Sequence, residues 1–343
     1  MTVSRMFAAW RSALVVMAML LTSATYAQPA AGVDLLERPS AGGAADVVSV
    51  HFTLLDIVDI DDKAQRFEID AYVELRWQDP RLALPGSGEH VRLMTLDEIW
   101  TPGLAILNDR GLEPLLPEVA RVSEGGQVVV RRRLAGPLAV DLKLHDFPYD
   151  RQVLTVDVLS YLHGPDEVQY AQDSELVSNP DTFSADGWGF EVLPPERSEF
   201  RVREGARGAP EISFRLMATR DSGFYVFTLL MPMTLIMLMT WMVHWLPPQL
   251  SPPRLGTASA AVFSVIAFGV SLRLSLPQVG YLTVADKFVI FSIIMVGISL
   301  AVAVLVARLV DIDRLDRALS VSRFMRWAFP LTFIAAMLLT RLN

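Results

Sequence analysis

The chain changes its hydrophobic pattern near residue 220. Before that point, several segments alternate apolar and polar residues, and clusters of Gly, Pro, Asn and Asp separate them; the clearest are Arg66–Trp77, Gln127–Gly136, Gln152–Tyr161 and Glu211–Arg220. A period of two is typical of antiparallel strands with one buried face. The pattern therefore predicts a β-sandwich or barrel for residues 28–221.

Beyond residue 221 the alternation stops and four long apolar stretches follow, at about 222–246, 254–276, 286–310 and 323–340. Each is close to the ~20 residues with which a helix crosses a hydrocarbon core. Pro232 and Pro330 lie inside two of them, which membrane helices tolerate. We therefore expect a membrane domain of four helices over residues 222–343.

The N-terminus has the pattern of a secretory signal peptide over residues 1–27. Arg5 and Arg11 supply positive charge, Ala13–Leu21 is apolar, and small residues precede Ala27. A first membrane helix is the alternative, but the uncharged run is short for a span. Basic residues gather around the short link between the third and fourth stretches, at Arg308, Arg314, Arg317, Arg323 and Arg326. This bias predicts that the large domain and the C-terminus lie outside.

The second apolar stretch is rich in Gly, Ala, Ser and Thr and has Arg254 and Arg273 at its ends. One face repeats at spacings of four and three: Gly256, Ala260, Phe263, Ala267, Val270 and Leu274. A displaced stripe carries Thr257, Ser264 and Ser271. Close helix packing is one interpretation of the small residues. A pore-lining helix with charged mouths is the other, since a lipid-facing arginine is costly.

Composition excludes several classes of function. The 343 residues include no cysteine, so disulfides, thiolate metal sites and cysteine nucleophiles are excluded. The net charge of −8 argues against a nucleic-acid partner. No residue spacing forms a nucleophile elbow or a zinc site, so neither an enzyme nor a metal or other cofactor is predicted.

Short motifs in a fixed order carry a family resemblance: "RWQD" (Arg76–Asp79), "WTP" (Trp100–Pro102), "FPYD" (Phe147–Asp150) with Gln152, and "SLPQVGY" (Ser275–Tyr281). The chain resembles the pentameric ligand-gated ion channels, the Cys-loop receptor family, in the prokaryotic branch that lacks the disulfide. The resemblance implies an extracellular immunoglobulin-like β-sandwich, four membrane helices and a homopentamer in a bacterial inner membrane. The implied partners are the lipid bilayer, small ions and an agonist or protons.

The resemblance also assigns the pore. It places Gly256, Ala260, Phe263, Ala267, Val270 and Leu274 on the pore side, with Phe263 as the gate. Cation-conducting relatives carry a glutamate just before the arginine, whereas here Pro252 and Pro253 precede Arg254. "PPRLGT" looks like the "PARVGL" of animal glycine and GABA receptors, so rings of Arg254 and Arg273 predict an anion (chloride) channel. The alternatives are an Arg254 that points into protein, a cation-selective channel, and a non-conducting solute sensor.

For the agonist site, which the family forms between subunits, counting from the motifs gives Tyr161, Leu107 and, on the complementary face, Tyr72. The loop implied to cap the site carries Arg203 and Arg207 but no aromatic residue. This does not favour a cation–π cage and suits an anionic agonist instead; a solvated hairpin tip is the alternative. Proton gating also stays open, since His51, His90, His145 and His163 lie in this domain.

The residues that couple the two domains are also implied by the resemblance. The family brings the signature loop, the turn after the first strand and the arginine before the membrane close to the linker after the pore helix. Here these residues are Phe147, Pro148 and Asp150, then Asp62 and Arg220, with Pro277 and Tyr281 on the linker. An arginine buried between two carboxylates is costly to unpair, so it is suited to a two-state switch.

Overall fold

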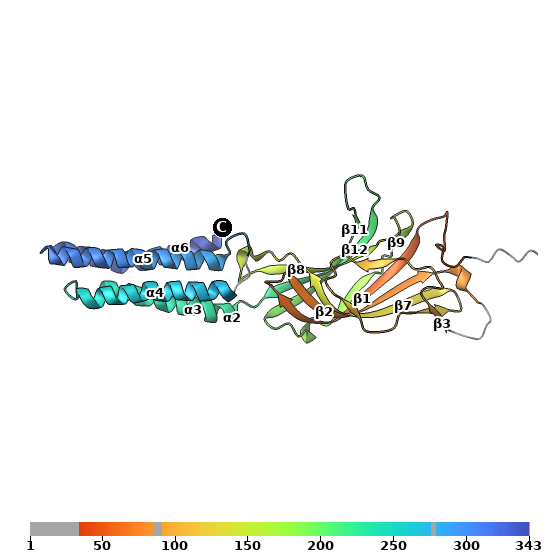
Figure 1. Ribbon diagram of the computed structural model, residues 1–343, viewed down its shortest axis with the longest axis horizontal. Helices are drawn as coiled ribbons and strands as arrows, with labels where there is room; N and C mark the ends of the chain where they lie inside the picture. Colours follow the sequence, from red (N-terminus) through yellow and green to blue (C-terminus); the bar gives the residue numbers. More distant parts are fainter. Residues whose placement is uncertain (1–33, 85–90, 276–278, 343) are drawn as a thin grey trace, which may run out of the picture.

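The computed structural model describes residues 34–84, 91–275 and 279–342. A sheet domain occupies one end of an elongated molecule, and a helix bundle continues it at the other (Figure 1). The predicted signal peptide, His90 and Pro277 lie outside the described residues, and the side chain of Leu274 is not described.

Two sheets make up the sheet domain. The larger has the order β10-β1-β2-β7-β6-β3, with β9 beside β1 and β5 beside β7, and the smaller has the order β11-β12-β8-β4. The larger sheet contains β1 (Asp46–Asp61), β2 (Arg66–Gln78), β3 (Val91–Thr95), β5 (Glu113–Pro114), β6 (Val119–Ser123), β7 (Gln127–Ala139), β9 (Val168–Tyr170) and β10 (Glu175–Ser178). The smaller contains β4 (Leu104–Ile106), β8 (Arg151–Ser160), β11 (Trp188–Phe200) and β12 (Ala209–Arg220).

The four segments that alternate most clearly in sequence are strands β2, β7, β8 and β12, so the period-two prediction is confirmed there. The pairing is not wholly antiparallel, because β1 pairs in parallel with both β9 and β10. The inward faces meet in one core, where Phe52 of β1 stacks on Phe214 of β12 with ring centroids 5.5 Å apart. Burying one such ring stabilises the fold by about 2–3 kcal/mol.

The helical part begins three residues after β12. The first long helix runs through α2 (Gly223–Tyr225), a π-helical turn (Val226–Leu230), α3 (Met231–Met242) and a 3₁₀ turn (Val243–Trp245). Three further helices follow: α4 (Ser251–Ser275), α5 (Val284–Asp311) and α6 (Leu315–Leu342). The π turn comes just before Pro232, a residue that cannot donate a helical hydrogen bond.

Among the described residues, three helices are long and apolar enough to cross a membrane: Gly223–Trp245, Ser251–Arg273 and Val284–Asp311. α6 packs along α5 and ends at the side of the bundle that faces the sheet domain (Figure 1). It is not one of the three, so the fourth span at 323–340 stays a prediction. Large apolar side chains such as Phe224, Phe227 and Leu235 are exposed on the first helix, as expected of a surface that meets lipid or another subunit.

Candidate gating junction, pore face and ligand site

Arg220 is the last residue of β12 and lies where the sheet domain meets the helices. Its guanidinium forms forked ion pairs with two carboxylates. Nε and Nη2 donate to Asp150 at 2.8 and 3.2 Å, and Nη1 and Nη2 donate to Asp62 at 2.8 and 2.9 Å. Asp62 follows β1 and Asp150 precedes β8, so one side chain joins three segments that are distant in sequence.

Aromatic rings surround the Arg220 guanidinium. Its central carbon lies 4.1 Å from the ring centroid of Trp188, 4.9 Å from that of Phe147 and 5.6 Å from that of Tyr225. Burial acts to lower the pKa of Arg220, but the hydrogen bonds and charges of Asp62 and Asp150 outweigh it and raise the pKa overall. The arginine therefore stays charged, and the junction depends on keeping both carboxylates next to it.

The apolar residues of the FPYD loop contact the helix bundle. A 3₁₀ turn (Leu144–Asp146) precedes the cis peptide bond between Phe147 and Pro148, and both of these residues are buried. The backbone N–H of Ala285, in α5, donates to the Phe147 carbonyl at 3.3 Å. Pro148 and Tyr149 line a small cavity together with Leu229, Leu230, Val284, Ala285, Phe288 and Met337 of the bundle.

Gln152 holds the loop from within. Its amide nitrogen donates to Asp150 Oδ2 at 2.6 Å and to the Lys143 carbonyl at 3.1 Å, while its Oε1 accepts from the Lys143 N–H at 2.9 Å. Gln152 therefore closes the loop by hydrogen bonds and orients the carboxylate that Arg220 binds. In this cysteine-free loop, those hydrogen bonds add to the packing and the ion pair.

Tyr281 connects the loop to the segment that leads into α5. Its hydroxyl accepts a hydrogen bond from the Leu144 N–H at 2.9 Å, and its ring stacks on His145 with centroids 3.8 Å apart. Two residues later Thr283 caps α5, where its side chain and that of Asp286 satisfy each other's backbone N–H groups. The linker is thereby fixed both to the FPYD loop and to the start of a long helix.

The structure thus brings Asp62, Phe147, Pro148, Asp150, Arg220 and Tyr281 to one junction, as the resemblance implied. Trp188 and Tyr225 had no predicted role, Gln152 was named only with the FPYD motif, and His145 only among the histidines that keep proton gating open. Gln152 stood with the FPYD motif and His145 lies two residues before Phe147, so their positions in the sequence could have indicated both residues. Tyr225 carried no such signal, since it is one aromatic residue within an apolar run.

One face of α4 is open in the single chain. Gly256, Ala260, Phe263, Ala267 and Val270 are all exposed, and 74% of Phe263 is accessible. Residues on the other side, among them Ala258, Ala261 and Val265, are buried against the rest of the bundle. Ser264 and Ser271 are exposed beside this row, and Thr257 is half-buried. The open face is therefore wide enough to include the small and apolar row and most of the hydroxyl stripe.

The arginine at the start of α4 corrects one prediction. Arg254 is fully buried, and it donates to the Leu246 carbonyl at 3.2 Å and to Ser322 Oγ, on α6, at 3.0 Å. It therefore points into its own bundle, which was the alternative interpretation, because the guanidinium finds acceptors there and not on the open face. Pro252, in the first turn of α4, is exposed.

Arg273, near the other end of α4, is exposed. It lines a cavity of about 180 Å³ between α4 and α5, together with Val270, Val289 and the carboxylate-bearing Asp286. The two arginines that the sequence treated alike therefore occupy different environments. Only Arg273 lies on the side of α4 that the rest of the chain leaves accessible.

The predicted ligand residues fall on two sides of the sheet domain. Tyr161 follows β8 and is exposed, and its N–H donates to the Gly103 carbonyl at 3.0 Å. Leu107 follows β4, the neighbour of β8, and is also exposed. Tyr72 lies instead in the other sheet, on β2, where Arg133 rests 5.6 Å from its ring centroid. Tyr72 and the strand that Tyr161 follows thus belong to different sheets of the domain.

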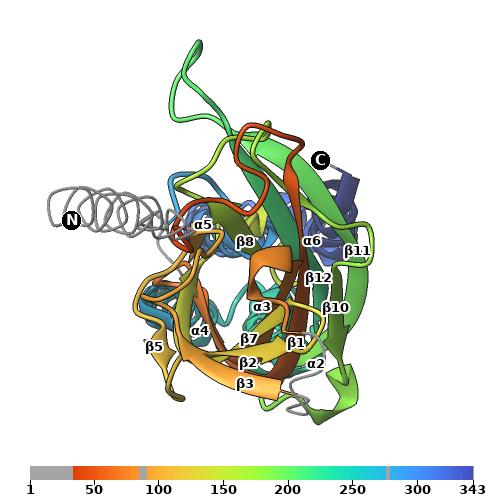
Figure 2. The ribbon, with the colours of Figure 1, turned by 90° about the vertical axis from the view of Figure 1, so that its right-hand side faces the viewer.

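The loop joining β11 and β12 projects from the sandwich in both views (Figures 1 and 2). Arg203 is exposed in it. Arg207, at the root of the loop, pairs with Asp166 at 3.0 Å and with Glu167 at 3.1 Å. Arg207 is thus already bound to two carboxylates, which is less suited to capturing an anionic agonist than an unpaired arginine. Among the described residues, no group of three or more His, Asp and Glu side chains is arranged to hold a metal ion.

Comparison with known proteins agrees with this geometry. The family described as "Neurotransmitter-gated ion-channel ligand binding domain" matches residues 28–221, which is more than half of the chain. The chain is 25% identical over 321 residues to the "Proton-gated ion channel" of Gloeobacter violaceus (strain ATCC 29082 / PCC 7421), covering 91% of this chain and 87% of that protein.

Receptor subunits from animals are similar too. Identity is 23% over 287 residues with a "Gamma-aminobutyric acid receptor subunit beta" of Lymnaea stagnalis, and 25% over 296 residues with a "Gamma-aminobutyric acid receptor subunit beta-like" of Drosophila melanogaster. Each match covers 78% of this chain but only 57% and 58% of the longer receptor subunits. The chain belongs to the neurotransmitter-gated ion-channel family. It is a membrane protein of the ligand-gated channel family, and the relatives that it matches are channels and not enzymes.

Proposed function

We propose that five copies of this chain form one channel, in which an agonist or protons acting on the sheet domains open a central pore. The observation that carries the proposal is Arg220, which holds Asp62 and Asp150 together at the junction of the two domains. Support for the pore comes from the open face of α4, where small residues and Phe263 stand clear of the rest of the chain.

The junction offers a mechanism for opening. Movement of the sheet domain alters the positions of Asp62 and Asp150 relative to the end of β12, and Arg220 can retain both carboxylates only in a limited set of geometries. A charge network that is either fully paired or partly broken favours discrete states. Tyr281 and Ala285 then transmit the position of the FPYD loop to α5, against which α4 packs.

Anion selectivity is part of the proposal and rests on Arg273. Five exposed arginines at one mouth raise the local anion concentration and repel cations. Arg254 is buried and does not contribute to such a ring. Asp286 lines the same cavity as Arg273, and its negative charge opposes the positive potential of the arginine. It is therefore the carboxylate to test for an effect on selectivity.

The proposal also includes the agonist site, the fourth membrane helix and the orientation in the membrane. The agonist site lies between two subunits, with Tyr161, Leu107, Arg203 and Arg207 from one and Tyr72 from its neighbour. α6 supplies the fourth membrane helix, and the sheet domain faces the outside of a bacterial inner membrane. Arg314, between α5 and α6, and the arginines in the adjoining parts of the two helices support this orientation.

Two-electrode recording from oocytes that express the full chain tests the proposal. Solutions of stepped pH, small carboxylates and small amines are applied in turn, and the reversal potential is measured in asymmetric NaCl. The proposal predicts an evoked current that reverses near the chloride potential. Reversal near the sodium potential establishes the cation-selective alternative. Surface protein that gives no evoked current with any of these stimuli overturns the conducting role and favours a solute sensor.

A further inference from the structure

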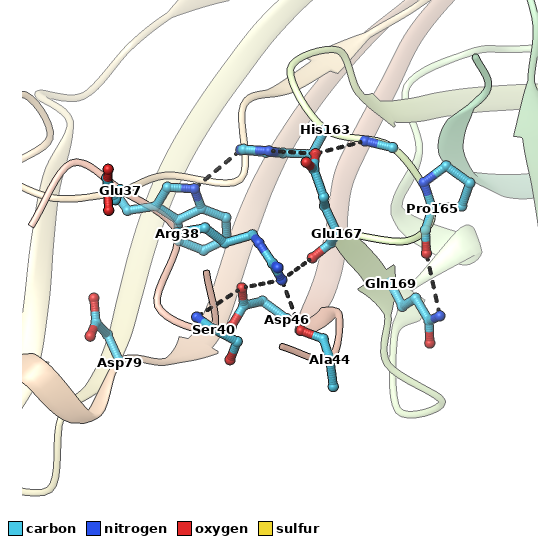
Figure 3. A network of polar contacts seen from close by, with 12 residues as sticks. Glu37, Arg38, Ser40, Ala44, Asp46, Asp79, His163, Pro165, Glu167 and Gln169 are labelled. Carbon is cyan, nitrogen blue, oxygen red and sulfur yellow. Dashed lines mark hydrogen bonds and ion pairs between the residues drawn. The ribbon is translucent and has the colours of Figure 1, made fainter. Parts of the chain in front are cut away.

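A second polar network in the sheet domain centres on His163 (Figure 3). Trp100 Nε1 donates to His163 Nε2 at 3.1 Å, and His163 Nδ1 lies 3.3 Å from Glu167 Oε2. The indole N–H is a donor only, so Nε2 must accept and carries no proton. The ring is therefore neutral in this arrangement, with its proton on Nδ1 directed at Glu167.

The same carboxylate oxygen helps to hold the loop that projects from the sandwich, Arg201–Gly208, here called the capping loop. Glu167 Oε2 accepts from Arg207 at 3.1 Å, from the Gly164 N–H at 3.2 Å and from His163. Arg207 also pairs with Asp166 at 3.0 Å. We call the pairing of Arg207 with these two carboxylates the latch.

Gly164 is necessary for the latch. A Cβ atom at this position would lie 2.5 Å from Arg207 Nε, 2.5 Å from Asp166 Oδ1 and 2.8 Å from Arg207 Nη2. These are the ends of flexible side chains, so a larger residue would displace Arg207 without disturbing the backbone. The chain thus has a glycine at the one place where it lets the guanidinium approach its partners.

We propose that His163 is a proton-binding site whose protonation releases the capping loop by taking Glu167 from Arg207. A second proton must bind at Nε2, where it faces the Trp100 N–H across 3.1 Å, so the ring has to leave the indole. The imidazolium then forms a charge-assisted hydrogen bond with Glu167 and repels the nearby guanidinium. Arg207 then pairs with Asp166 only, and the end of the capping loop at Arg207 becomes more mobile.

The other charges around His163 do not replace it as the sensor. Hydrogen bonds from Arg207 lower the pKa of both Asp166 and Glu167, so these carboxylates keep their charge to a lower pH than ordinary carboxyl groups do. From the N-terminal segment, Arg38 pairs with Asp46 at 3.0 Å and donates to the Glu167 carbonyl at 3.1 Å.

Beyond these lie Glu37 and the Asp79–Arg81 pair. Histidine is the side chain whose charge ordinarily changes between pH 5 and 8.

A spin label on the capping loop of the full-length protein in nanodiscs tests the proposal. The chain has no cysteine, so Val202→Cys, at a position that is 85% exposed, gives a single labelling site. Acidification from pH 8 to pH 5 should raise the ratio of mobile to immobile label by about two- to fivefold, the change expected when one exposed ion pair is lost.

Variants separate the latch from general effects of acid. His163→Gln, which stays neutral, should abolish the transition. Gly164→Ala should give the mobile spectrum at every pH with His163 intact. His51→Gln is the matched control, because His51 lies 3.6 Å from Glu175 and its side chain is 18% exposed, against 17% for His163. It should leave the transition unchanged.

The proposal is overturned if the label of the otherwise unaltered protein shows no transition, or if the transition persists in His163→Gln. It depends on the proposed function only in placing the capping loop over an agonist site. The label reports on the loop whether or not the protein conducts, so a silent channel with a working latch refutes the proposed function alone, and a conducting channel without the transition refutes the latch alone.

Discussion

Two buried arginines near opposite ends of the membrane domain illustrate two uses of the same residue. Arg220 binds two carboxylates from distant segments and lies among three aromatic rings. Arg254 binds a carbonyl and a hydroxyl, both within the helix bundle. The first arrangement links domains through charges that must stay matched; the second fixes helix ends to one another. From this difference we propose a gating role for Arg220 and an anchoring role for Arg254.

The largest effect is expected for Arg220→Ala. It leaves the Asp62 and Asp150 carboxylates together without their cation, which costs about 3–5 kcal/mol for a buried pair. We expect no evoked current while surface biotinylation still detects the protein. Arg215→Ala, on the same strand with the exposed partner Glu196 at 2.5 Å, is the control and should leave the current intact. Normal currents from Arg220→Ala would contradict the gating role of Arg220 and its contrast with Arg254.

A smaller effect is expected for Asp150→Asn. The amide keeps the shape of the carboxylate, and Asp62 still neutralises Arg220. The amide nitrogen cannot accept, however, so one of the two charge-assisted hydrogen bonds from Arg220 is lost and the other is weakened. A loss of about 1.5–3 kcal/mol corresponds to a 10- to 100-fold rise in the half-activating concentration. Dose–response curves with an activator of the unaltered channel provide the measurement. An unchanged curve would show that Asp62 alone sets the junction.

Measurements of ion selectivity should distinguish the buried Arg254 from the exposed Arg273. Arg273→Gln should shift the reversal potential in asymmetric NaCl away from the chloride potential, because it removes charge from the accessible face. Arg254→Met should leave the reversal potential unchanged. It should instead lower thermal stability by about 1–3 kcal/mol, since the Leu246 carbonyl and Ser322 lose their donor. A selectivity shift in Arg254→Met would contradict the anchoring role.

The smallest effect is expected for Tyr281→Phe. The ring still stacks on His145, but the Leu144 N–H loses its acceptor. One neutral hydrogen bond contributes about 1 kcal/mol, so the half-activating concentration should rise about fivefold. Tyr281→Ala, which also removes the stacked ring, should have a larger effect. Equal effects of the two variants would show that the hydroxyl is the whole of the contact.

Sequence patterns predicted the strands well where both faces are regular, as in β2 and β12, because period-two burial is visible in residue order. They did not reveal the parallel pairing of β1 with β9 and β10. That pairing depends on where the chain that connects these strands comes back to the sheet. At the junction, the motif placed Asp150 beside Arg220, yet Tyr225 was missed because one ring in an apolar run carries no distinguishing pattern.

The direction of Arg254 was also beyond the sequence. Arg254 and Arg273 both stand at helix ends, where a charge is expected to face water or a polar cavity. Only the fold shows that Leu246 and Ser322 offer acceptors inside the bundle to Arg254. For the ligand site, the sequence indicated Arg207 but not the two carboxylates that pair with it. Asp166 and Glu167 come from a different loop.

We propose that Arg220 and Asp62 act as a unit in gating, and a double-mutant cycle tests this coupling. Arg220→Lys keeps the charge and loses the fork, and Asp62→Asn removes one carboxylate; half-activating concentrations are recorded for both single variants, the double variant and the unaltered channel. If the two residues act as a unit, the coupling energy should be about 1–3 kcal/mol. Effects that add to within about 0.5 kcal/mol would contradict it.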